Sequence, residues 1–118
     1  MELSHGRHIR DIIQERNIIL KGADVATARG FTQVPNFLLK STKLSVGDKL
    51  TFAMLLSYAW QNDYCFPGQQ RLAVDLGLDE RSVRRHIKSL QGAGLLAIQR
   101  RGQGKTNIYE LNLKPKAV

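Results

Sequence analysis

The sequence predicts a mostly helical α+β fold that ends in a β-hairpin, and three patterns in its 118 residues carry this prediction. The first is a long apolar helix that starts at Ser45. The second is a pair of short helices joined through Gly77. The third is a change from helical to alternating periodicity after Leu95, on both sides of a glycine-rich turn. A chain of this length favours one domain, and its core needs no metal or disulfide.

The N-terminal residues, 1–30, are expected to form an extension made of a helix and a connector. The helix is predicted from three isoleucines at the spacing of one helical face: Ile9, Ile12 and Ile13. Residues 18–20 could form a short strand, and the small, polar residues 22–30 read as the connector. Two uses of the extension stay open. It either packs on its own domain or makes the contact between the subunits of a homodimer.

Residues 31–113 are expected to form the main domain, followed by a short tail at 114–118. A short helical turn is predicted within 31–40, because Pro35 suits a helix start and three apolar residues follow it. Ser45 and Asp48 have the spacing of a capping box, which predicts the start of the strongest helix. This helix is apolar nearly all round and is therefore expected to be central and buried.

Two short helices are predicted next, with a tight turn between them. Pro67 opens the first, and three residues at core spacing follow: Leu72, Ala73 and Leu76. Gly77 is placed to adopt the left-handed conformation that ends a helix. Asp79 is a suitable N-cap for the second helix, which Gly92 and Gly94 end. A short helix, a glycine turn and a second helix together favour a helix-turn-helix.

The second of these helices has a cationic outer face. On a helical wheel, one narrow arc faces the core and holds Val83, Ile87 and Leu90. Arg81, Arg85 and Lys88 lie opposite, with Arg84 beside them and Ser82 on a flank near the helix start. His86 lies at the edge of the core arc. It is expected to be packed or half-exposed rather than a metal ligand, because no Cys or His stands at metal spacing.

After Leu95 the apolar residues alternate, as in a hairpin with one face on the core. Leu96 and Ile98 alternate on one side of the glycine-rich turn at 102–104, and on the other side Tyr109, Leu111 and Leu113 do the same. The tip of this hairpin adds cations and hydrogen-bonding side chains to the candidate site: Arg100, Arg101, Gln103, Lys105, Thr106 and Asn107.

The distribution of charge points to a polyanionic partner. The formal net charge is +8, and residues 81–106 alone hold seven Lys or Arg and no Asp or Glu. The other 92 residues carry 11 basic and 10 acidic side chains, so the excess is local. A solvated charged face is the alternative. Cations on both the helix and the hairpin tip favour a binding face instead.

Other classes of protein are disfavoured. No catalytic constellation, phosphate loop or Cys/His couple is visible, so no enzymatic activity, cofactor or metal is expected. The single cysteine, Cys65, excludes an internal disulfide. No apolar run is long enough to span a membrane, and the N-terminus lacks the apolar core of a signal peptide. A cytoplasmic protein that does not bind membranes is therefore expected.

Residues 31–113 resemble the winged helix-turn-helix family of plasmid and phage replication initiators and small regulators of mobile elements. The resemblance is carried by QVPNFLL at 33–39, LLSYAW at 55–60, CFPGQQRLAVDLGL at 65–78, SVRRHIKSLQGAGLL at 82–96 and RRGQGKTNIYEL at 100–111. It implies binding of double-stranded DNA, with the helix at 80–92 in the major groove and the hairpin, or wing, on the adjacent backbone or minor groove. Gly68 departs from the family pattern, which usually has Ser or Thr there, and this removes one possible phosphate contact.

The candidate residues divide into three roles. Arg81 and Arg85 are expected to read bases, with Ser82 as a smaller contributor, because the start of a recognition helix reaches base edges. Phosphate contacts are expected from Gln69, Gln70, Arg84 and Lys88, and further contacts from the wing residues named above.

The leading hypothesis is a sequence-specific DNA-binding transcriptional regulator that acts as a homodimer, because two half-sites raise specificity. A replication-initiation protein that binds origin repeats and contacts the replication machinery is the alternative. A winged-helix module that binds proteins is a second alternative, against which the dense cations of helix and wing argue.

Overall fold

The computed structural model describes residues 17–61, 66–105 and 107–114. The chain divides into two compact units, Met1–Phe31 and Thr32–Val118. The first unit contains one described helix, α2 (Ala23–Arg29), none of whose residues is buried. The isoleucines from which an earlier helix is predicted lie outside the described residues.

Two predictions for the first unit are wrong. Residues 18–20 form no strand and are exposed. The stretch predicted as a connector is largely helical, because α2 spans Ala23–Arg29. Three of its seven residues are alanine, the best helix former. Asp24 in its first turn and Arg29 in its last both complement the helix dipole. Gly22 and Gly30, both with positive φ, bound the helix.

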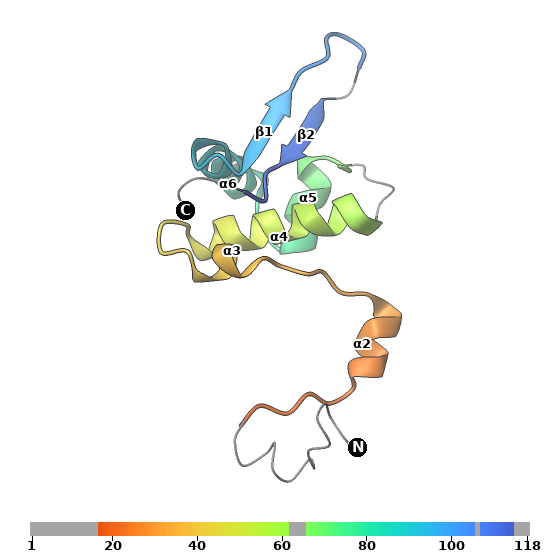
Figure 1. The fold of residues 1–118 in the computed structure, drawn as a ribbon. Coiled ribbons are helices and arrows are strands. Elements are labelled where there is room, and N and C mark those ends of the chain that lie inside the picture. The colour runs from red at the N-terminus through yellow and green to blue at the C-terminus, as the bar shows by residue number, and fades with distance from the viewer. Residues whose placement is uncertain (1–16, 62–65, 106, 115–118) are drawn as a thin grey trace. The chain divides into compact units, whose positions relative to one another are not determined.

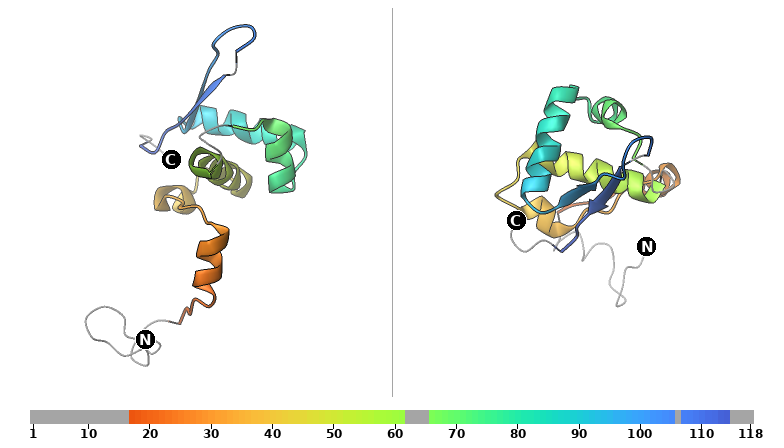
Figure 2. Two further views of the ribbon diagram at one scale, coloured as in Figure 1. Left: turned by 90° about the vertical axis from the view of Figure 1, so that its right-hand side faces the viewer. Right: turned by 90° about the horizontal axis from the view of Figure 1, so that it is seen from above.

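The second unit is mostly helical and ends in a two-stranded antiparallel hairpin, as predicted (Figure 1). Its elements in chain order are α3 (Asn36–Lys40), α4 (Val46–Gln61), α5 (Gln69–Leu76), α6 (Glu80–Gly92), β1 (Leu96–Gln99) and β2 (Ile108–Leu111). Helix α4 lies between α3 on one side and α6 on the other (Figure 2). None of the helices in the described part of the chain is long and apolar enough to cross a membrane.

Helix α4 begins at the predicted capping box. The Ser45 backbone N–H donates to Asp48 Oδ2 at 3.2 Å, and the Asp48 N–H donates to Ser45 Oγ at 3.0 Å. These two bonds satisfy backbone donors that a helix start leaves free. The helix supplies the centre of the core with Phe52, Leu55 and Leu56, which pack against residues of α3, α5 and α6. Contrary to the expectation of all-round burial, its outer face leaves apolar side chains exposed, among them Val46, Leu50 and Trp60.

The turn between α5 and α6 has the predicted geometry. Gly77 adopts a left-handed conformation with φ of 69°, and the Leu78 N–H donates to the Ala73 carbonyl at 3.0 Å. Asp79 caps α6, since its Oδ1 accepts from the Ser82 N–H at 2.8 Å. Helix α5 begins at Gln69, with Gly68 as its N-cap. Pro67, which is predicted to open this helix, therefore lies just before it.

The hairpin pairs Leu96 with Leu111 and Ile98 with Tyr109, so the predicted apolar face is formed. All four of these side chains pack in or against the core. Leu113 departs from the prediction, since it is 48% exposed. The reason is that β2 ends at Leu111. The Asn112 N–H then donates to the Leu95 carbonyl at 2.8 Å, and the alternation of buried and exposed side chains ends there.

Candidate nucleic-acid interface

Helix α6 has one buried and one cationic face. Val83, Ile87 and Leu90 are buried in the core, and this fixes which side of the helix turns outward. The four predicted cations, Arg81, Arg84, Arg85 and Lys88, are all exposed. Their charges are therefore available to a partner. The helical wheel predicts this division of α6 into a buried and a cationic face, and the structure confirms it.

The start of α6 brings two of these arginines close to the capping carboxylate. Hydrogen bonds from the Ser82 side chain and backbone N–H hold the pKa of Asp79 below its ordinary value, with smaller contributions from the charges of Arg85 and Arg81. The Ser82 side chain is thus already engaged with the carboxylate that caps the helix. Its capacity to contact a base is smaller than that of the two arginines.

Arg84 has a weak partner on its own helix. Its Nη1 lies 3.7 Å from Oε2 of Glu80, one turn earlier, and both side chains are about half exposed. Exposed pairs of this kind contribute little free energy. Arg84 can therefore leave Glu80 for a phosphate at small cost, which suits a positioning contact better than a fixed base contact.

The wing carries its polar residues at an exposed tip. The described members of the predicted set, Arg100, Arg101, Gln103, Lys105 and Asn107, are all exposed, and Thr106 lies outside the described residues. The turn needs two glycines in the left-handed region, Gly102 with φ of 105° and Gly104 with φ of 78°. The hairpin projects from the helices, so its tip can reach a surface beyond them (Figure 1).

A groove joins the wing to the start of α5. It has a volume of about 650 Å³, with Arg101, Lys105 and Asn107 on its wing side and Gly68 on its helix side. Its lining also includes Phe66 and Tyr109, whose rings meet edge to face with centroids 4.5 Å apart.

The two glutamines predicted to contact phosphates lie beside this groove, at the start of α5. Gln69 is half-buried and Gln70 is exposed, and no side chain caps the helix before them. The first backbone N–H groups of α5 therefore have no side-chain cap. Free donors at a helix N-terminus favour contact with an anion.

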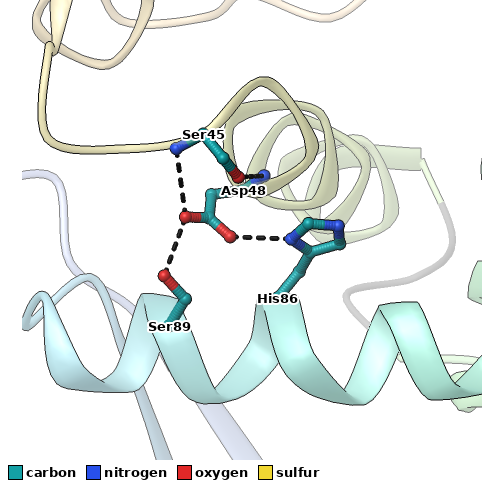
Figure 3. A network of polar contacts seen from close by, with 4 residues as sticks. All are labelled: Ser45, Asp48, His86 and Ser89. Carbon is teal, nitrogen blue, oxygen red and sulfur yellow. Dashed lines mark hydrogen bonds and ion pairs between the residues drawn. The ribbon is translucent and has the colours of Figure 1, made fainter.

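Sequence reasoning missed the polar cluster that holds the inner side of α6. His86 is packed, in agreement with the prediction, and its Nδ1 lies 2.8 Å from Asp48 Oδ1 (Figure 3). The Ser89 hydroxyl donates to the other oxygen, Asp48 Oδ2, at 2.7 Å. We call these residues, with Ser45, the Asp48 cluster. Asp48 and His86 are 38 positions apart, so no local spacing could have revealed the contact.

The hydrogen bonds of the cluster decide the ionisation of Asp48. Burial raises its pKa, but the bonds from Ser89, His86 and Ser45 together outweigh burial and bring the pKa below the ordinary value. The side chain is only 6% exposed, so the carboxylate is a buried charge whose acceptor sites are filled by donors.

Gly47 makes room for the imidazole of this cluster. A Cβ at this position would lie 2.3 Å from both Cε1 and Nε2 of His86, well inside contact distance. Glycine has a low helix propensity and is therefore unfavourable in the first turn of α4. Its presence here follows from the close approach of α6.

The described residues hold no group of three or more His, Cys, Asp or Glu side chains that could bind a metal ion. The residues that the structure brings together are instead cations and amides on α6, the wing and the start of α5. Such an arrangement can bind a polyanion along one surface.

Comparison with known proteins agrees with this geometry. Residues 42–96 match the family model of a helix-turn-helix domain. No curated protein matches the chain. A solved N-terminal domain of a DNA-binding protein has 22% identity and a TM-score of 0.60, over 87% of this chain and 88% of that one. The structure of a Rep–DNA complex has 22% identity and a TM-score of 0.59, over 85% of this chain and 87% of that one. Residues 42–96 are thus similar to a helix-turn-helix domain, and with the β1–β2 hairpin the second unit has a winged helix-turn-helix fold.

Proposed function

We propose that this protein binds double-stranded DNA in a sequence-specific manner, with α6 in the major groove. The observation that carries the proposal is the exposed cationic face of α6, opposite three buried side chains of a helix-turn-helix. The wing then reaches the adjacent backbone or minor groove. The two solved structures that share the fold are described as a DNA-binding protein and a Rep–DNA complex, which supports this proposal.

Base reading is assigned to Arg81 and Arg85, one helical turn apart on the exposed face of α6. An arginine can donate two parallel hydrogen bonds to O6 and N7 of guanine, a pattern that no other base pair edge offers in the major groove. Ser82 has a smaller part, because its side chain is also engaged with the capping carboxylate of Asp79.

The remaining cations and amides hold the phosphate backbone. On the helices these are Gln69, Gln70, Arg84 and Lys88, and on the wing they are Arg100, Arg101, Gln103, Lys105, Thr106 and Asn107. Such contacts fix the orientation of the protein and add affinity for any sequence. They also make binding weaken as salt rises, because each neutralised phosphate releases counterions.

The biological role that we propose is transcriptional regulation by a homodimer, which contacts the transcription machinery. A single module with two base-reading arginines specifies a short site, and a dimer on two half-sites lengthens it. The alternative is an initiator of plasmid or phage replication, which the shared fold with the Rep–DNA complex favours.

Selection of bound duplexes from a random pool, read by sequencing, tests both levels of the proposal. A palindromic site supports the dimeric regulator, and direct repeats support the initiator. Recovery of no enriched sequence would contradict sequence-specific binding altogether. Sedimentation of the protein with and without the selected duplex then measures the number of subunits in the complex.

The division of roles on α6 is tested by Arg85→Ala and Lys88→Ala. We expect Arg85→Ala to weaken binding to the selected duplex by about 1–3 kcal/mol while binding to random duplex changes less. Lys88→Ala should weaken both by a similar factor and reduce the slope of log affinity against log salt by about 1. Equal losses of Arg85→Ala on the two duplexes would contradict base reading by this residue.

A further inference from the structure

Two kinds of contact on the inner side of α6 hold its cationic face in place. The apolar contacts come from Val83, Ile87 and Leu90, which are all buried. Burial of apolar surface is favourable but non-directional, so it keeps the helix on the core without defining its rotation sharply. Hydrogen bonds to a fixed acceptor depend on both distance and angle and can define it.

The Asp48 cluster supplies such directional contacts. His86 and Ser89 are three residues apart on α6 and approach the two oxygens of one carboxylate, at 2.8 and 2.7 Å (Figure 3). Residues at this spacing lie on the same side of a helix, one turn apart. Two contacts from successive turns to one acceptor restrain both the rotation of α6 and its position along its axis.

The acceptor itself is fixed. Asp48 belongs to the first turn of α4, and the Ser45 backbone N–H donates to the same oxygen that accepts from Ser89. Because an ionised carboxylate only accepts, the hydrogen bond from His86 requires a proton on Nδ1. The opposite edge of the imidazole lies against Gly47, where the missing Cβ leaves room for it. The ring is therefore confined on both edges.

We propose that Asp48, His86 and Ser89 are positioning residues that set the angle at which α6 presents its arginines to bases. The inference rests on the proposed function, which it deepens. Arg85 is the neighbour of His86 in the chain, so a rotation that moves one moves the other by the same angle. A recognition constellation must be held to within about 0.5 Å and 10–20° of its productive geometry. Contacts with phosphates tolerate larger shifts, because long cationic side chains can adjust to them.

The test compares four variants on the selected duplex and on random duplex, well below the melting temperature of each variant. His86→Ala and Ser89→Ala each remove one donor. His86→Asn keeps a donor, because an asparagine amide can take the place of Nδ1. Gln91→Ala, at an exposed position of the same helix, is the matched control.

We expect His86→Ala to lower the ratio of specific to random affinity about tenfold, which corresponds to about 1.4 kcal/mol. Ser89→Ala should lower it by a smaller factor, and His86→Asn should recover much of the loss. Gln91→Ala should leave the ratio unchanged. Affinity for random duplex should stay close to wild type in all four variants, since the cations are retained.

A merely structural role gives a different result. If His86→Ala and Ser89→Ala lower the melting temperature but keep the wild-type specificity ratio, the positioning role is wrong. Ser89→Ala keeps the test decisive should His86→Ala fail to fold, because it removes only one hydroxyl. A wild-type protein that shows no preference for any duplex would overturn the proposed function, an outcome that is visible before any variant is made.

Discussion

Two of the polar links between α4 and the helices α5 and α6 differ in their exposure to solvent. At the start of α4, the Asp48 cluster binds α6, with side chains of Asp48 and His86 that are 6% and 12% exposed. Further along α4, the Tyr58 hydroxyl donates to Asp75 Oδ2 of α5 at 2.7 Å. Asp75 is 23% exposed and also meets Arg71, whose side chain is 65% exposed.

The difference indicates which helix is held more firmly. In the second link, burial and then the hydrogen bond to Asp75 raise the pKa of Tyr58, and the hydrogen bond from Tyr58 is the main cause that lowers the pKa of Asp75. If this link is broken, water can reach Asp75. If the first is broken, the Asp48 carboxylate and the His86 imidazole, which are both largely shielded from water, lose each other as partners. Loss of the link to α6, the helix proposed to read bases, should therefore lower the free energy of unfolding more than loss of the link to α5.

The largest effect is expected from Asp48→Ala. The change removes the acceptor for His86, Ser89 and the Ser45 N–H, so it should lower the free energy of unfolding by about 3 kcal/mol. Urea denaturation followed by circular dichroism measures this. Asp75→Ala is the matched change in the exposed link and should have a clearly smaller effect. Similar losses in the two variants would contradict the contrast between the links.

Gly47→Ala should have the next largest effect. The new Cβ would displace the His86 ring from Asp48, so we expect a loss of about 2 kcal/mol in the free energy of unfolding. In the His86→Ala background the obstacle is absent, and alanine should then stabilise the helix by up to about 1 kcal/mol relative to glycine. A double-mutant cycle by urea denaturation measures this change of sign. Destabilisation in both backgrounds would show that the ring is not what excludes a side chain here.

Tyr58→Phe tests the second link directly. The ring stays in the core and only the hydroxyl that donates to Asp75 is lost, so we expect a loss of about 1 kcal/mol. In the Asp75→Ala background the same change should have little further effect, because the acceptor is already gone. Thermal unfolding of the four proteins of this cycle gives the coupling. Additive losses would show that the hydroxyl acts without Asp75.

Local features of the fold could be predicted from the sequence because their causes lie within a few residues. The capping box of Ser45 and Asp48, the left-handed Gly77 and the Asp79 cap each depend on contacts within five residues along the chain. The hairpin follows from period-two alternation around glycines. The cationic face of α6 follows from the three apolar residues on its opposite side.

Contacts between distant segments could not be predicted in this way. The sequence predicts the capping role of Asp48, but the bonds of Asp48 to His86 and Ser89 depend on how α4 and α6 cross. The small residues of α2 suit both a connector and a helix, so composition alone does not separate the two. The structure shows a helix, in line with its three alanines. Leu113 continued the alternation in the sequence but follows the end of β2.

Acid should weaken the Asp48 cluster. The folded pKa of Asp48 is below its ordinary value of 3.8, so its contribution is present above that value and is lost as pH falls through the folded pKa. Asp48→Asn cannot titrate. The free energies of unfolding of wild type and Asp48→Asn should therefore converge as pH falls from about 5 to about 2. Parallel curves over this range would show that the shift of Asp48 does not contribute to acid stability.

The smallest effect is expected at Thr51, which lies on the same helix as both links but makes no polar link itself. It is fully buried, and within the described part of the chain its hydroxyl oxygen has no hydrogen-bond partner. Thr51→Val replaces this hydroxyl with a methyl group of similar shape, so we expect a gain of about 0.5 kcal/mol in the free energy of unfolding. Urea denaturation measures it, with the exposed Thr42→Val as the control that should not change. A loss of stability would show that the Thr51 hydroxyl is bound by a partner such as a buried water. Helix α4 would then hold a further buried polar contact, at a residue between Asp48 and Tyr58.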